Sequence, residues 1–245
     1  MLLSPKQTSL LNQVSQKIQS KTFDIYTAVL GVLLFRLLPN IKHVLIGIDA
    51  NRSDLSWDKP MGCVLNTLPI RLDRPETNTK LGPFLGKVRD AINGVLEHSS
   101  VPFDVLVNEL KLDRSANCSP VFQVMIQHRI ESQDRVTWCN ATRSRGKSLK
   151  PCTGFDLHLE IVENAEGNSV VSLEMQQGLY SQEHTDLLVK TYVNLLEQLT
   201  TIPEAPLETA ELWSSEDTSM ALRVATGMQT HFLLHVSSFR LTVSL

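Results

Sequence analysis

The stretch that decides the fold is residues 46–72, which read IGIDANRSDLSWDKPMGCVLNTLPIRL. Two apolar runs, residues 43–48 and 63–70, are short and contain several β-branched side chains, which is typical of buried strands. A polar loop separates the two runs. The pattern therefore predicts a strand, a loop and a second strand in the middle of a core.

Polar and charged residues stand where the first of these strands leaves the core, namely Asp49, Asn51 and Arg52. Arginine cannot give up its charge, so near a core it needs a carboxylate or several carbonyl groups around it. Structural ion pairs occupy such positions more often than functional sites do, because ion pairs also form in ordinary loops. Taken alone, these residues favour a structural anchor.

On either side, apolar residues at helical spacing predict helices at residues 4–20, 23–38, 81–98 and 181–199. The second of these stretches is apolar nearly all round, which predicts a buried core helix with Thr22 or Asp24 as its N-cap. Ser181 is a suitable N-cap for the last one. A further short helix is expected at residues 103–111, directly after a proline.

Three more strands are expected, at residues 120–130, 155–162 and 169–176. The last two are predicted to form a hairpin, because the residues between them accept positive φ angles. Residues 131–152 are polar and lack periodicity, and we expect a long loop or a pair of irregular edge strands there. A helix that follows such a hairpin is typical of α+β proteins.

Composition excludes several classes of partner. A net charge of −3 over 245 residues provides no long-range field that would select nucleic acid or an anionic membrane. The four cysteines have no CxxC spacing and no signal peptide is recognisable, so we expect reduced thiols in a cytoplasmic protein. The most apolar stretch, residues 28–38, is too short to span a bilayer and contains Arg36.

Motifs that carry chemistry on their own are missing from the sequence. No glycine-rich phosphate loop, GxSxG motif or metal-ligand spacing occurs. The segment His158-Leu159-Glu160 has some similarity to a zinc-deaminase signature, but no paired cysteines follow it. Side chains two residues apart share one face of a strand, so we expect His158 and Glu160 to form ordinary hydrogen bonds or salt bridges. We predict no catalytic residue and no metal ligand.

Five ordered segments carry a family resemblance: IGIDANR, MGCVLNTLPIRLD, EHSSVPFDVLVNEL, RSANCSPVFQVMIQHR and TGFDLHLEIVENAEGNSVVSLEMQQGLYS. They resemble the second half of a condensation domain of nonribosomal peptide synthetases. The similarity is greatest to fungal hybrid polyketide synthase and nonribosomal peptide synthetase enzymes, which make secondary metabolites, including mycotoxins. The resemblance covers about residues 20–199. It implies an α+β fold (an α/β sandwich), specifically a chloramphenicol-acetyltransferase-like lobe that has a mixed sheet with flanking helices.

Two such lobes form a V-shaped channel in the family. The phosphopantetheine arms of carrier proteins enter the channel from both ends, and an amide bond joins an acyl chain to an aminoacyl group. The resemblance therefore implies an acyl or peptidyl carrier protein as a partner. It also implies that phosphopantetheine is carried by that partner and that this chain binds no cofactor directly.

The sequence departs from the family in one respect. The HHxxxDG motif, whose second histidine serves as a base or positioning group, belongs to the first lobe and is absent here. General acid–base catalysis typically contributes about 10²–10⁴-fold, so we expect the chain alone to lack most amide-forming activity. In the family, the arginine that matches Arg52 pairs with the aspartate of that motif. Without it, Arg52 would turn to solvent, pair with Asp49 or Asp54, or remain buried and unpaired at a cost of about 3–5 kcal/mol.

The resemblance also implies roles for particular residues, none of them a catalytic nucleophile. Bracing of the channel is implied for Asp49, Asn51 and Arg52. Anchoring of strand and loop is implied for Asn66 and Arg71. Structural roles in the later motifs are implied for Ser119, Gln123 and Asp156.

We expect three segments: an N-terminal helix at residues 1–22, the condensation lobe at residues 23–202, and a linker with a poorly ordered tail at residues 203–245. Our leading interpretation is a truncated condensation-like protein whose missing first lobe is a potential partner. Two alternatives stay open. One is a non-enzymatic module that docks a carrier protein or another megasynthase domain, and the other is a fragment of a longer hybrid synthetase.

Overall fold

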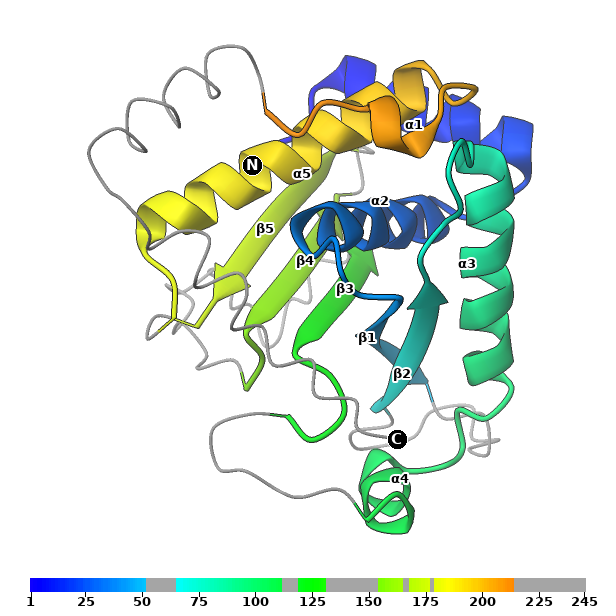
Figure 1. Cartoon of the computed structure of the whole chain (residues 1–245), viewed down its shortest axis with the longest axis vertical. Helices are drawn as coiled ribbons and strands as arrows, with labels where there is room; N and C mark the ends of the chain where they lie inside the picture. Colours follow the sequence, from blue (N-terminus) through cyan, green and yellow to red (C-terminus); the bar gives the residue numbers. More distant parts are fainter. Residues whose placement is uncertain (52–64, 112–118, 131–153, 165–167, 177–178, 214–245) are drawn as a thin grey trace, which may run out of the picture.

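The computed structural model describes residues 1–51, 65–111, 119–130, 154–164, 168–176 and 179–213. Within these ranges the chain forms helices and strands that enclose one hydrophobic core (Figure 1). Their order is α1 (Pro5–Ile18), α2 (Thr22–Leu37), β1 (His43–Asn51), β2 (Leu65–Asp73), α3 (Leu81–Leu96), α4 (Phe103–Glu109), β3 (Val124–Ile130), β4 (Leu157–Glu163), β5 (Ser169–Met175), α5 (Gln182–Thr201) and the short 3₁₀ helix η1 (Leu207–Thr209).

The five strands form one mixed sheet in the order β2-β1-β3-β4-β5. Strand β1 pairs antiparallel with β2 and parallel with β3, which is itself parallel to β4. Strands β4 and β5 form the antiparallel hairpin that the sequence predicted. The mixed sheet and its flanking helices confirm the predicted fold class.

Side-chain alternation along the strands defines two faces of the sheet. One face carries the apolar side chains, such as Ile46, Ile70 and Leu159, which join the core. Helices α2, α3 and α5 pack on this face, and α1 covers α2 and α5 (Figure 1). Helix α2 is buried along nearly its whole length, as its all-round apolar sequence predicted.

The helix starts follow from local capping. The Ser4 hydroxyl accepts a hydrogen bond from the Gln7 amide at 3.3 Å, and the Gln7 side chain accepts one from the Ser4 amide at 2.8 Å. This reciprocal capping box starts α1. Ser181 caps α5 as expected, but the N-cap of α2 is Lys21, so the expectation of Thr22 or Asp24 was wrong. The Asp24 carboxylate instead accepts a hydrogen bond from the Lys21 amide at 2.9 Å.

Several predicted element ends were wrong by a few residues. Strand β1 continues to Asn51, because its antiparallel register with β2 extends from His43 opposite Asp73 to Asn51 opposite Leu65. Strand β3 begins at Val124, four residues later than expected. Helix α4 ends at Glu109, two residues earlier than expected. The predicted loop at residues 131–152 lies outside the described residues.

The segment after α5 packs against the lobe as far as the structure describes it. Leu207 and Ala210 are buried in the core. The Arg36 guanidinium donates hydrogen bonds to the carbonyls of Glu208 at 2.8 Å and Ala210 at 3.0 Å. Residues 203–213 are therefore part of the packed structure, whereas residues 214–245 lie outside the described ranges. The division of the chain into three segments otherwise stays a prediction.

Gly47 on β1 allows the ring of Phe122 to lie directly over the strand. A Cβ atom at this position would lie 2.1 to 2.8 Å from three carbons of the Phe122 ring, which is far inside van der Waals contact. The Phe122 ring packs between Phe103 and Phe155, with ring centroids 5.6 and 5.4 Å away. This aromatic cluster therefore requires glycine at position 47.

We predict that Gly47→Ala lowers the free energy of unfolding by about 1–3 kcal/mol, because the Phe122 ring must leave its packed position. Urea denaturation monitored by circular dichroism measures this change. Gly86→Ala on α3 is the matched control, since no atom lies within 4 Å of its added Cβ and alanine favours a helix by about 1 kcal/mol. A Gly47→Ala variant as stable as the wild type would contradict the assigned packing.

Candidate functional site

The sheet face opposite the helices is the candidate site. Among the described residues, the aromatic cluster of Phe103, Phe122 and Phe155 covers one part of it, across Gly47. The remainder carries polar side chains contributed by all five strands, including Asp49, Thr67, Gln127, His158 and Glu174. We call this the open face.

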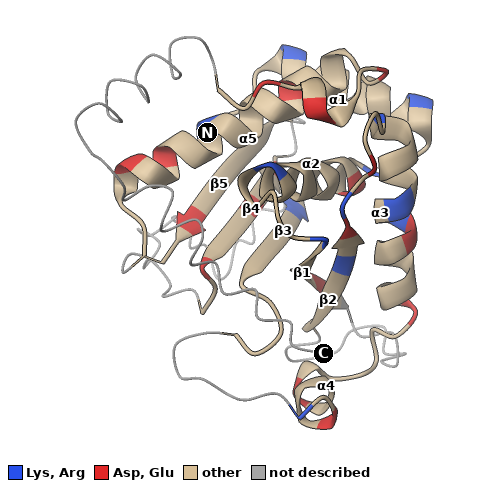
Figure 2. Cartoon of the chain, in the orientation of Figure 1, with Lys and Arg blue, Asp and Glu red and all other residues tan. Residues whose placement is uncertain are grey.

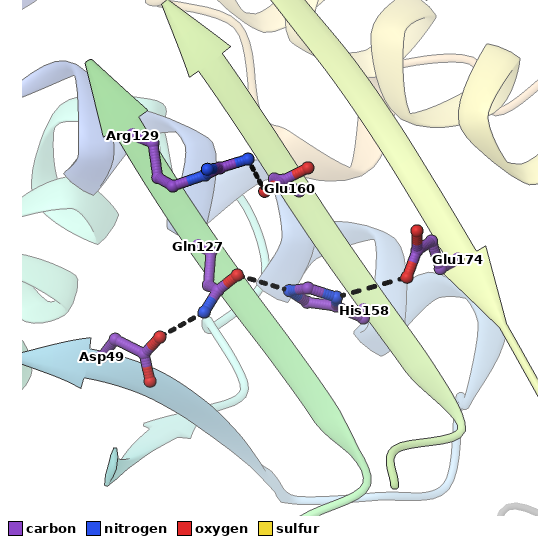
Figure 3. A network of polar contacts seen from close by, with 6 residues as sticks. All are labelled: Asp49, Gln127, Arg129, His158, Glu160 and Glu174. Carbon is purple, nitrogen blue, oxygen red and sulfur yellow. Dashed lines mark hydrogen bonds and ion pairs between the residues drawn. The ribbon is translucent and has the colours of Figure 1, made fainter. Parts of the chain in front are cut away.

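A row of polar contacts crosses four strands of the open face (Figure 3). The Gln127 amide on β3 donates a hydrogen bond to Oδ2 of Asp49 on β1. On its other side, Oε1 of Gln127 lies 3.0 Å from Nε2 of His158 on β4. Nδ1 of His158 lies 3.7 Å from Oε2 of Glu174 on β5. We call these four residues the polar row.

Asp49 is the member of the polar row that lines two cavities, whereas Gln127 lines the larger one. It lines a cavity of about 250 Å³ between α2, α3 and β1, and also one of about 400 Å³ at the ends of β1 and β3. Phe23 is the other residue common to both cavities. Thr67 on β2 also holds Asp49, because its hydroxyl donates to Oδ1 at 3.3 Å.

The charges around the polar row are mostly paired. Arg129 on β3 forms an ion pair with Glu160 on β4 at 2.5 Å. His158 contacts Gln127 and Glu160 contacts Arg129, so each of the two makes ordinary polar contacts with the neighbouring strand β3. Over the described elements, the positions of Lys and Arg are interspersed with those of Asp and Glu (Figure 2). No cluster of metal-ligating side chains occurs among the described residues.

The three residues expected to brace the channel have different outcomes. Asp49 stands at the junction of the two cavities. Asn51 is placed by its backbone only, as the last residue of β1 opposite Leu65. Arg52 lies outside the described residues, so its pairing with Asp49 or Asp54 stays a prediction.

Of the two expected anchors on β2, Asn66 makes the more extensive contacts. Its buried amide nitrogen donates to the carbonyls of Ser99 at 2.9 Å and Val101 at 2.6 Å. Its side-chain oxygen accepts from the Phe103 amide at 3.2 Å. These bonds join β2 to the turn between α3 and α4. Arg71, by contrast, is exposed and pairs only with Asp73 at 3.3 Å among the contacts described.

The three residues of the later motifs lie beside the start of β3 and β4. The buried Gln123 side chain donates to the Ser119 carbonyl at 2.6 Å. The Asp156 carbonyl accepts from the Gln176 amide at 3.2 Å, which extends the β4–β5 hairpin by one bond. Burial raises the pKa of the Asp156 carboxyl above its ordinary value of 3.8. Burial and the nearby Asp156 charge together raise the pKa of Tyr180.

A second carboxyl with a shifted pKa lines the smaller cavity. Burial raises the pKa of Asp24, although the hydrogen bond from the Lys21 amide and the charges of Lys21 and Arg89 act in the opposite direction. Desolvation penalises the charged form more strongly than these neighbours favour it. Asp24 supports the start of α2 through its hydrogen bond from the Lys21 amide.

Sequence reasoning missed Gln127 and Phe23 as site residues, and assigned His158 no partner. Gln127 reaches Asp49 only because β1 and β3 are adjacent parallel strands, although 78 residues separate the two positions. The alternation of the strand at residues 120–130 could have placed Gln127 on the polar face. Strand order, which the sequence pattern left undetermined, was needed to pair it.

Comparison with known proteins gives a consistent family assignment. A family model described as the condensation domain matches residues 1–222. Equisetin synthetase eqxS of Fusarium heterosporum is 36% identical over 221 residues, which are 90% of this chain and 6% of that protein. Trichosetin synthetase PKS-NRPS1 of Gibberella fujikuroi is 38% identical over 223 residues, 91% of this chain and 6% of that protein. The chain thus spans about 6% of the length of these curated relatives.

Solved structures show the same fold. The condensation domain of the monacolin K polyketide synthase MokA superposes with a TM-score of 0.75 at 21% identity, covering 84% of this chain and 47% of that one. The X-domain of teicoplanin biosynthesis, solved in complex with OxyB, has a TM-score of 0.75 at 21% identity, covering 88% of this chain and 48% of that one. None of the helices in the described ranges is long and apolar enough to cross a membrane.

We predict that Asn66→Ala lowers the free energy of unfolding by about 2–4 kcal/mol, because two carbonyls and one amide lose their buried partner. Arg71→Ala is the matched control on the same strand, and we expect a change below about 1 kcal/mol for its exposed ion pair. Urea denaturation of both variants measures the difference. Equal effects would show that Asn66 does not anchor the turn.

We predict that Asp156→Asn becomes more stable relative to the wild type as pH rises. A carboxyl whose pKa is raised in the folded state binds its proton more tightly there than in the unfolded chain. Its contribution is fully present below the ordinary pKa of 3.8 and is lost as pH rises through the folded-state pKa, whereas asparagine does not titrate. Urea denaturation at several pH values between about 3 and 7 measures this difference, and a constant or falling one would refute the assignment.

Proposed function

Because the chain belongs to the condensation-domain family, we propose that it forms the second lobe of such a domain, which joins a carrier-bound acyl group to a carrier-bound aminoacyl group. Its sequence relatives are hybrid polyketide synthase and nonribosomal peptide synthetase enzymes of fungi, which supports a role in secondary-metabolite biosynthesis. The phosphopantetheine that carries each group belongs to a carrier protein rather than to this chain.

The proposal is carried by one observation: nearly the whole described chain fits about half of a solved condensation domain. Among the described residues, helices α1, α2, α3 and α5 lie on one face of its sheet, so the part of the open face outside the aromatic cluster is available to a second body. The HHxxxDG motif does not occur in these 245 residues. We infer that a first lobe carrying this motif stands opposite the open face and supplies the imidazole that handles the proton.

In this arrangement the chain contributes the opposite wall of the channel. The amine nitrogen attacks the acyl thioester carbon, and the carbon–sulfur bond breaks to release the phosphopantetheine thiolate of the first carrier protein. The proton that nitrogen loses passes to this thiolate with the help of the first lobe's histidine. The residues of this chain bind and orient the two arms. Asp49, Asn51 and Arg52 are assigned to bracing the channel, and Asn66 to holding the turn between α3 and α4 in place.

We predict that the purified chain alone forms no amide above background when given an acyl-loaded and an aminoacyl-loaded carrier protein. Adding a separately expressed first lobe from a related fungal synthetase should raise the rate by about 10²–10⁴-fold, the contribution typical of general acid–base catalysis. Mass spectrometry of the carrier-bound product measures this rate. The control is the same first lobe with the second histidine of its motif replaced by alanine.

Two outcomes would contradict the proposed function. Amide formation by the chain alone would show that it needs no first lobe. Binding of the loaded carrier proteins with no turnover in the complete mixture would favour the non-enzymatic docking module instead.

A further inference from the structure

We propose that Gln127 and His158 are positioning residues that hold the Asp49 carboxylate where it accepts a hydrogen bond from the amine of the aminoacyl group. This inference rests on the proposed function, because the amine belongs to the group that the channel receives. It assigns to Asp49 a contact with the substrate in addition to the bracing role. It also assigns to the polar row the role of positioning the Asp49 carboxylate.

The order of donors and acceptors along the row allows one arrangement. A carboxylate only accepts hydrogen bonds, so the amide nitrogen of Gln127 must face Asp49. The amide oxygen of Gln127 then faces Nε2 of His158, which must carry a hydrogen to donate across the 3.0 Å separation. Glu174 lies near the opposite ring nitrogen, at 3.7 Å. The imidazole and the amide therefore fix the rotation of the Asp49 carboxylate.

The larger cavity is the place where an amine would meet this carboxylate. Asp49 is the one carboxylate among its described lining residues, and the rest of the wall includes the apolar side chains of Phe23, Leu65 and Ile126. The cation in this wall, Arg129, is already paired with Glu160 at 2.5 Å. Among the described residues, each carboxylate oxygen has one protein donor, from Thr67 or Gln127, and the other lone pair of each oxygen can accept a hydrogen bond from a ligand.

The smaller cavity is less suited to an amine. Lys21 and Arg89 line it together with Asp49 and Asp24. The positive charges of Lys21 and Arg89 would repel a protonated amine nearby. Burial also raises the pKa of the Asp24 carboxyl, which disfavours its charged form. The geometry therefore directs the amine to the side of Asp49 that faces β3.

The test uses the whole chain without a first lobe, so that it does not depend on turnover. Two probes are titrated by calorimetry at neutral pH: glycyl-pantetheine, which has a free amine, and N-acetylglycyl-pantetheine, in which the amine is blocked. We expect glycyl-pantetheine to bind at least about tenfold more tightly than N-acetylglycyl-pantetheine, because a hydrogen bond to a charged group contributes about that much affinity. Asp49→Asn should remove this preference, because it removes the negative charge and keeps the shape of the side chain.

The positioning role of Gln127 and His158 is tested by variants that should lose the amine preference and by one that should restore it. Gln127→Leu and His158→Leu should each reduce the preference to below about threefold, because Asp49 is no longer held. His158→Gln should restore it, since a glutamine amide can donate to Oε1 of Gln127. Ser172→Ala on β5 is the matched control on the same face, and it should leave the preference unchanged. Thermal unfolding of each variant confirms that it is folded.

Each result has a definite meaning. A preference that survives Asp49→Asn, or that His158→Gln fails to restore, would overturn the inference. Amide formation in the two-lobe mixture without any amine preference would overturn it too, while leaving the proposed function intact. An amine preference that follows the expected pattern, in a chain that supports no amide formation, would uphold the Asp49 contact and reject the proposed function.

Discussion

The burial of helix α2 is the constraint on which the rest of the structure depends. Its sequence is apolar nearly all round, so it must be covered on every side to be stable. Strand β1 covers one side, and α1, α3 and α5 cover the others. This requirement gathers α1, α2, α3 and α5 on a single face of the sheet. It leaves the opposite face to polar side chains, and this is the face to which we assign the function.

Much of the fold could be predicted from local patterns. The helix at Leu81–Leu96 and the β4–β5 hairpin were expected from spacing and turn composition, because these signals lie within a few residues of one another. The start of β3 was not predicted. One of its preceding residues is held by tertiary contacts, since the Phe122 ring lies over Gly47 of β1 and packs against Phe103.

The candidate site could be predicted only in part, because its contacts join residues that are far apart in the sequence. Asp49 stood out because it follows a buried strand, and Asn66 because it lies in a segment that resembles a family motif. The polar row joins residues that are 78 and 31 positions apart, and it exists because β1, β3 and β4 are parallel neighbours. Strand order follows from how helices and strands pack in three dimensions, so no local pattern reveals it. The contacts of segment 203–213 could not be predicted for the same reason, because they join it to Arg36 and to the distant β2–α3 connection.

The central claim is that a first lobe covers the open face, and carboxyl footprinting tests it most directly. Glu160 and Glu174 lie on the open face, whereas Glu183 and Glu211 are exposed elsewhere, at the start of α5 and beyond its end. With a carbodiimide and an amine label, the account predicts that adding the first lobe protects Glu160 and Glu174 and leaves Glu183 and Glu211 unchanged. Protection of the second pair, or of neither, would contradict it.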